Sequence, residues 1–115
     1  MKRALSQHQQ PALDYLEMEN PAAGMRLTEL ELFRSGAPFK ASRFTVEPGC
    51  SSPVDSHSVR EIWIIAKGKG EVLYDGHAVR ARADDVFYFE PFKTHQLRND
   101  SAGKIVVFSI WWEGR

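Results

Sequence analysis

The sequence has a single cysteine, no net charge and no long hydrophobic run. Cys50 cannot form a disulfide within the chain, so nothing indicates an oxidising compartment, and we interpret it as a passive thiol. Fifteen basic residues balance fifteen acidic ones, which gives no reason to expect nucleic acid or a membrane surface as a partner. No apolar run approaches the roughly 20 residues of a membrane span. We therefore expect a cytoplasmic protein that binds a small molecule.

The 115 residues fit one barrel domain preceded by a short amino-terminal arm. Residues 1–24 are polar and rich in glutamine, and prolines bracket the segment LDYLEMEN, which has room for at most two helical turns. From residue 25 onward, short runs of β-branched and aromatic residues alternate with turn signals such as Asp75-Gly76. This pattern predicts an all-β sandwich or barrel over residues 25–115.

The segment SPVDSHSVREIWIIAKGKG combines metal-binding residue types with the apolar pattern of a buried strand. On one straight strand, His57 and Glu61 would lie roughly 13 Å apart, too far to share an ion. They can meet only if the chain reverses at residues 58–60. Asp55 and His57 would then share one face of the outgoing strand, and Glu61 would open the returning strand opposite them.

The spacing of these residues resembles the first motif of the cupin superfamily. Gly49, His57, Glu61 and Gly68 match the first glycine, the second histidine, the glutamate and the closing glycine of that motif, with every gap kept. Asp55 stands where the motif has its first histidine. The resemblance implies a double-stranded β-helix, the cupin jelly-roll barrel.

A weaker match to the second cupin motif follows. His95 and Asn99 keep the family's histidine and asparagine at the family spacing. Asp84, Glu90 and Phe92 replace the expected glycine, proline and glycine. Together the two motifs extend the resemblance over most of the chain.

The resemblance implies one divalent metal ion inside the barrel. Two imidazoles, from His57 and His95, and the Glu61 carboxylate form a set that binds Fe(II) and also suits Mn, Ni, Zn or Co. We predict Asp55 as a fourth ligand. The alternative is that Asp55 lies beside the open coordination position and acts as a general base. Asp55 and Glu61 are the candidate catalytic residues.

The predicted pocket surrounds this metal site. Trp63 and Ile65 share the parity of Glu61 along their strand and should face the interior, although core packing alone would also explain them. Asn99 belongs to the second motif, and Arg43 could bind an anionic substrate if its side chain points inward. The histidines expected to be exposed are His8 and His77. The aromatic residues expected in the core or an interface are Phe87, Phe89, Trp111 and Trp112.

Three functions fit these observations, and the third and least favoured is a structural role through the aromatic carboxyl-terminal strand. The first is a metal-dependent enzyme that acts on a small polar metabolite by isomerase, lyase, decarboxylase or dioxygenase chemistry. The second is a non-catalytic binding or sensor module for a sugar or another small metabolite. We favour the enzyme, although a fold alone does not fix a function. Sheet edges and the aromatic carboxyl-terminal strand also predict a homodimer.

Overall fold

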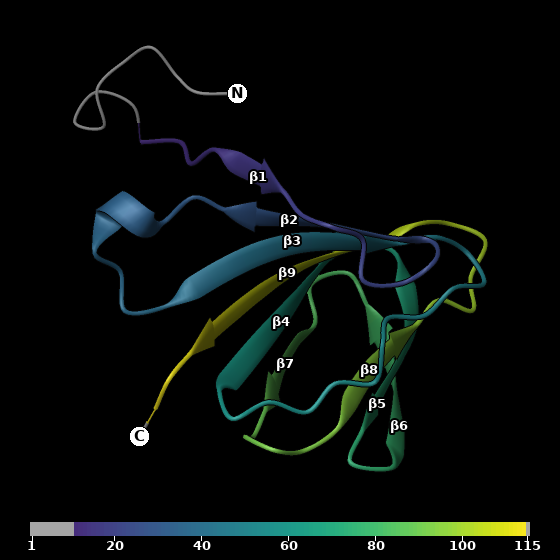
Figure 1. The fold of residues 1–115 in the computed structure, drawn as a ribbon. Helices are drawn as coiled ribbons and strands as arrows, with labels where there is room; N and C mark the ends of the chain where they lie inside the picture. The colour runs from purple at the N-terminus through teal and green to yellow at the C-terminus, as the bar shows by residue number, and fades with distance from the viewer. Residues whose placement is uncertain (1–10, 115) are drawn as a thin grey trace.

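Two antiparallel β-sheets make up the computed structural model, which describes residues 11–114 (Figure 1). The larger sheet contains, in spatial order, β1 (Tyr15–Glu17), β2 (Met25–Leu30), β3 (Lys40–Val46), β9 (Ile105–Trp112), β4 (Arg60–Lys67) and β7 (Val86–Phe89). The smaller sheet contains, also in spatial order, β6 (His77–Arg82), β5 (Lys69–Tyr74) and β8 (His95–Arg98). A single 3-10 turn, η1 (Phe33–Ser35), lies between β2 and β3. The predicted all-β jelly roll is confirmed.

Residues of the larger sheet line up in rows across its inner face, because directly paired residues of antiparallel strands point to the same side. One row, from β2 across β3 and β9 to β4, is apolar: Leu27, Phe44, Val107 and Ile65. The next row is mostly polar: Glu29, Ser42, Ser109 and Trp63. The inner face therefore changes from apolar at one end to polar at the other.

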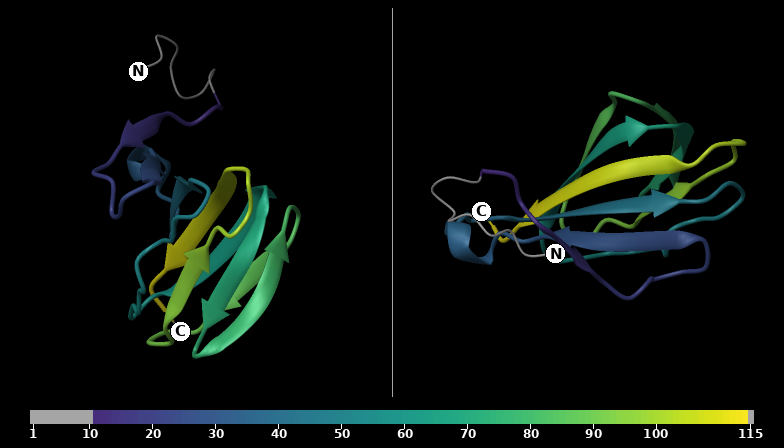
Figure 2. Two further views of the ribbon diagram at one scale, coloured as in Figure 1. Left: turned by 90° about the vertical axis from the view of Figure 1, so that its right-hand side faces the viewer. Right: turned by 90° about the horizontal axis from the view of Figure 1, so that it is seen from above.

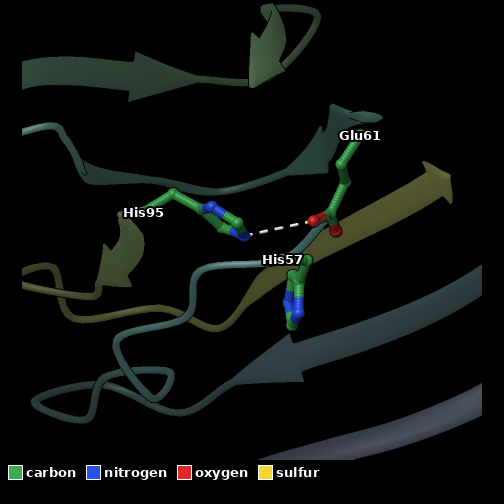
Figure 3. A group of neighbouring side chains, drawn as sticks. All are labelled: His57, Glu61 and His95. Carbon is green, nitrogen blue, oxygen red and sulfur yellow. Dashed lines mark ion pairs between the residues drawn. The ribbon is translucent and has the colours of Figure 1, made fainter. Parts of the chain in front are cut away.

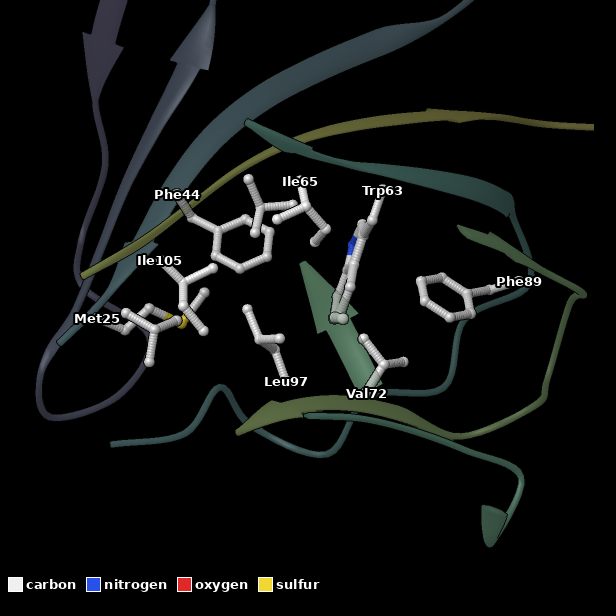
Figure 4. Close-up of a cluster of buried hydrophobic side chains, with 11 residues drawn as sticks. Met25, Phe44, Trp63, Ile65, Val72, Phe89, Leu97 and Ile105 are labelled. Atoms are coloured by element: carbon white, nitrogen blue, oxygen red, sulfur yellow. The ribbon is translucent and has the colours of Figure 1, made fainter. Parts of the chain in front are cut away.

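The hydrophobic core fills the apolar end between the two sheets (Figure 4). Trp63 packs edge-on against Phe44 and Phe89, with ring centroids 5.4 and 4.8 Å apart. Val72 and Leu97 from the smaller sheet belong to the same cluster of core residues and are almost wholly buried. Burial of each such side chain stabilises the fold by about 1.5–3 kcal/mol, so this end holds the two sheets together.

The backbone is left-handed at four positions that the cupin motifs give to glycine. Gly49 and Gly68 have φ of 78° and 91°, and Asp84 and Phe92 have φ of 80° and 66°. Aspartate tolerates this conformation because its short side chain bonds locally, whereas a bulky residue is strained there by about 1–2 kcal/mol. The fold therefore keeps the conformation of the motif where the sequence has lost the glycine.

In the amino-terminal arm, the segment with room for at most two helical turns contains a strand instead. Its residues 15–17 form β1, which pairs with β2 and extends the larger sheet at the edge far from the smaller sheet (Figure 2). Pairing satisfies backbone groups that the edge of β2 would otherwise leave open. None of the helical turns within residues 11–114 is long and apolar enough to cross a membrane. His77 is exposed as predicted, and His8 lies outside the described residues.

Candidate metal centre

The three residues of the predicted metal set meet at the polar end of the barrel (Figure 3). One ligand atom from each of His57, Glu61 and His95 lies within 4.8 Å of the other two. The chain bends at Ser58 and enters β4 at Arg60, so it changes direction where the distance argument required. His95 comes from the opposite sheet, at the start of β8. Residues from both motifs thus lie side by side.

Glu61 is held by hydrogen bonds to both of its carboxylate oxygens. Its Oε1 lies 3.1 Å from Nε2 of His95. Its Oε2 accepts hydrogen bonds from the Trp63 indole nitrogen at 2.9 Å and from the Ser109 hydroxyl at 2.5 Å. Burial would raise the pKa of Glu61, but these three hydrogen bonds together hold that pKa below its usual value. The side chain is therefore an oriented carboxylate anion.

Aromatic rings and a backbone carbonyl fix the imidazole of His95. Phe89 stacks on it with centroids 4.6 Å apart and planes 6° from parallel, and Trp63 meets it edge-on. Its Nδ1 lies 3.3 Å from the carbonyl oxygen of Lys93, which directs Nε2 towards Glu61. Burial would lower the pKa of His95, but the Glu61 carboxylate raises it above its usual value. An oriented Nε2 is what a metal-binding histidine needs.

Asp55 is fixed beside this cluster but is not part of it. Its backbone exchanges two hydrogen bonds with that of His95, at 3.0 and 2.9 Å, so both side chains point to the same face. Its Oδ2 lies 3.9 Å from Nε2 of His57. The β-pairing of this segment with β8 consists of isolated bridges instead of the regular outgoing strand that we expected, and Pro53 has no N–H for a ladder.

A cavity of about 610 Å³ opens onto the cluster. Its apolar lining residues are Pro21, Met25, Leu27, Pro53, Phe44, Val59, Trp63 and Trp111. Its polar lining residues are Glu29, Ser42, Ser52, Asp55, Ser56, His57, Ser58, Glu61, His95 and Ser109. Such a volume suits a small metabolite with both polar and apolar parts.

Three residues predicted for the pocket do not line it. Ile65 is 1% exposed and lies in the apolar row, one row deeper than Trp63. Asn99 is buried and bonds to the backbone, donating to the carbonyl oxygens of Val46 and Gly103 at 2.9 and 2.7 Å. The amide of Asn99 therefore stabilises the backbone of the loop and does not face the pocket.

Arg43 points to the outer face of the larger sheet. It is exposed, and its guanidinium carbon lies 5.2 Å from the centroid of the Tyr15 ring. Arg43 pairs with Phe108 and alternates with Ser42 and Phe44, which face inward. The strand's parity thus excludes this arginine from the pocket.

Among the lining residues that were not predicted from the sequence are Glu29, Ser42, Ser109 and Trp111. The parity of β2 carried a signal for Glu29, which shares the parity of Met25 and Leu27 in the run MRLTEL. Trp111 was predicted only as a core or interface residue, yet it pairs with Glu61 at the mouth of the barrel. The register between β9 and β4 places Trp111 beside Glu61, and the sequence does not reveal that register.

The donor set fits a divalent transition-metal ion. Two imidazoles and one carboxylate leave coordination positions open for substrate or water. Donors bound to one ion lie roughly 3–4 Å apart, so the set must contract slightly on binding. The second nitrogen or oxygen of His95 and Glu61 already has a hydrogen-bond partner, as ligands in metal sites usually have.

Comparison with known proteins agrees with this architecture. A Cupin 2 conserved barrel domain protein from Salinispora arenicola is 29% identical, with a TM-score of 0.75 over 99% of this chain and 89% of that chain. A predicted oxalate decarboxylase from Thermotoga maritima is 18% identical, with a TM-score of 0.76 over 90% of this chain and 96% of that chain.

A third similar structure is the Cupin_2 domain of an XRE family transcriptional regulator from Enterobacter cloacae. It is 22% identical, with a TM-score of 0.71 over 80% of this chain and 99% of that chain. These likenesses establish the fold without selecting a function. The model of the family described as Cupin domain matches residues 42–111, which is more than half of the sequence. The chain therefore belongs to the cupin domain family.

Proposed function

We propose that this protein is a metal-dependent enzyme that acts on a small polar metabolite. The observation that carries the proposal is the convergence of His57, Glu61 and His95 on a cavity of metabolite size. These residues would hold one Fe, Mn, Zn, Ni or Co ion. Such an ion polarises a substrate oxygen or activates water. The reaction classes open to the site are those of isomerases, lyases, decarboxylases and dioxygenases.

The side chains around the cluster have separate tasks in this proposal. Ser109 and Trp63 keep the Glu61 carboxylate in one orientation. Asp55, whose side chain is about half exposed and lies beside His57, can take a proton from a bound substrate or return one. Trp111 and Trp63 provide an apolar wall that excludes water from the reacting group.

The second candidate is a binding or sensor module without catalysis. The similarity to a cupin domain of a transcriptional regulator favours it. A sensor would use the same cavity but would need neither a proton-transfer group nor an open coordination position. A ligand that binds to the metal-loaded protein and is recovered unchanged after prolonged incubation would favour this candidate.

Elemental analysis of the purified protein tests the metal site. We expect near-stoichiometric divalent metal in the wild type and little in Glu61→Gln or His95→Ala. Glu47→Gln is the matched control, because it removes the same charge from an exposed carboxylate that pairs with Lys104. Full occupancy in the two site variants would refute the ligand assignment, and no metal in any protein would favour a metal-free binding module.

We also propose that the protein is a homodimer. Half-buried or exposed apolar side chains cover the outer face of β4, β7 and β9: Ile62, Ile64, Val86, Tyr88, Phe108, Ile110 and Trp112. Val86 is 61% exposed. A contiguous apolar face of this kind is stabilised when another surface covers it. A second copy of the chain offers the same face, as a dimer about a two-fold axis requires.

A further inference from the structure

The lining of the cavity contains carboxylates but no lysine or arginine side chain among residues 11–114. The lysine or arginine that would receive an anionic substrate is therefore missing from the described wall. Lys40 lies one row further out than Ser42 on the same face of β3, but it is exposed and outside the lining. The wall is unlike that of a pocket for a free carboxylate or phosphate, which arginine and lysine typically bind.

Of the three acidic residues that line the cavity, Glu29 is the one furthest from the metal cluster in the order of the strands. It is partly buried on β2, where it shares the inner face with Met25 and Leu27 and lies opposite Ser42. No basic side chain among the described residues forms an ion pair with it. Three strand spacings separate β2 from β4, which is about 14 Å between their backbones. Glu29 therefore forms the far wall of the cavity.

The charge of the loaded site would still be negative. A divalent ion brings two positive charges, and the ionised carboxylates of Glu61, Asp55 and Glu29 bring three negative ones. The negative charge furthest from the ion is that of Glu29. A carboxylate in a partly desolvated wall favours a cationic partner, because charge-assisted hydrogen bonds are strong there.

We propose that Glu29 is the specificity-determining residue of this pocket and selects a substrate with a cationic nitrogen, such as a primary amine. The other end of that substrate would carry the oxygen that faces the metal cluster. Its apolar middle would contact Phe44 and Trp111, which line the cavity between the two ends. The assignment of the metal end rests on the proposed function, whereas the amine end rests on Glu29 alone.

Three probes of similar shape test the charge preference: benzylamine, benzyl alcohol and benzoate. Each is titrated into the full-length protein by calorimetry, after metal removal by a chelator and again after metal loading. We expect metal-free wild type to bind benzylamine more tightly than benzyl alcohol, and benzoate least. Glu29→Gln should lower the benzylamine affinity about tenfold, as expected for loss of a charge-assisted bond, and leave benzyl alcohol unchanged.

Charge reversal and a distant control complete the experiment. Glu29→Lys should exchange the order of benzylamine and benzoate, while Glu47→Gln should bind all three probes like wild type. Circular dichroism checks that each variant is folded. Metal content, measured on the same samples, reports on the proposed function separately and should be normal in Glu29→Gln. No benzylamine binding to wild type, or equal binding to Glu29→Gln, would overturn the assignment.

Discussion

The indole nitrogen of Trp63 donates a hydrogen bond to Oε2 of Glu61 over 2.9 Å. The two residues are neighbours on one face of the same strand, β4. The hydroxyl of Ser109, from the adjacent strand β9, bonds to the same oxygen. Oε2 is thereby occupied, and Oε1 is the oxygen directed towards His95. Glu61 is thus arranged to offer a metal ion one oxygen.

The substitution Trp63→Phe keeps an aromatic ring in the core and removes the N–H donor. Because the partner of a ligand orients it, we expect metal affinity to fall roughly tenfold. The free energy of unfolding should also fall, by about 1 kcal/mol or more, through the lost hydrogen bond and the smaller ring. Calorimetric metal titration and urea denaturation measure the two effects. Trp112→Phe, on the outer face, is the control, and unchanged affinity in both variants would contradict the role of Trp63.

Asp55 lies next to the metal cluster but outside it, so the sequence-based prediction of a fourth ligand now has a sharper test. We expect Asp55→Asn to retain most of the metal, because the three remaining donors are unchanged. Turnover of a substrate, once one is identified, should fall at least a hundredfold if the carboxylate moves a proton. Loss of most metal from Asp55→Asn would instead establish direct ligation.

Phe92 has a left-handed backbone with φ of 66° and is 72% exposed. Its N–H donates to the carbonyl oxygen of His57 at 2.6 Å, which ties the turn before β8 to the metal cluster. We expect Phe92→Gly to raise the free energy of unfolding by up to about 1 kcal/mol, because relief of the strain outweighs the added freedom of the unfolded chain. Chemical denaturation measures this. Phe92→Ala keeps the strain and should show no such gain.

The pair of His95 and Glu61 predicts a pH dependence for the metal-free protein. The pKa of His95 is raised from 6.5, so its contribution to stability is complete below about pH 6.5 and is lost as pH rises through the raised value. The pKa of Glu61 is lowered from 4.5, so its contribution is complete above about pH 4.5 and is lost as pH falls through the lowered value. The pair therefore stabilises most between these limits.

Denaturation in the presence of a chelator, from pH 4 to pH 9, checks this dependence. We expect the free energy of unfolding to decline above about pH 6.5 as His95 loses its proton. In Glu61→Gln the decline should flatten, because the carboxylate that raises the pKa of His95 is gone. An equally steep decline in this variant would assign the dependence to other groups.

The outer face of β9 predicts the effect of a charge on assembly. Phe108 is half-buried near the middle of the apolar face formed by β4, β7 and β9. Phe108→Glu should convert the proposed dimer to a monomer, because a carboxylate would lose hydration in the interface. Sedimentation velocity measures the mass. Val79→Glu, on an exposed position of β6, should stay dimeric, and a monomeric wild type would rule the dimer out.

Local sequence was sufficient for the parts of the site that depend on one segment. The distance argument required a reversal between His57 and Glu61, and the chain bends there. Strand parity placed Trp63 at the cavity. The same parity could not fix the depth of Ile65, because depth depends on where the smaller sheet crosses the larger one.

Features that depend on pairing between distant strands were not predictable. Ser109 reaches Glu61 only through the register of β9 against β4, and nothing near Ser109 in the sequence records that register. Arg43 was ambiguous for the same reason, since its face depends on which neighbours the strand aligns with. Asn99 matched a motif, but its amide serves the loop backbone, a role that only the hydrogen bonds reveal.

The position of the last strand has a consequence for how the chain acquires its fold. β9 lies between β3 and β4, so it joins two parts of the larger sheet that otherwise do not pair. A nascent chain in which β9 is not yet made would expose two open strand edges and the apolar row behind them. Folding of the barrel must therefore wait until β9 has been synthesised, and these long-range pairings make it slow. Removal of the carboxyl-terminal strand should produce an aggregation-prone chain instead of a smaller barrel.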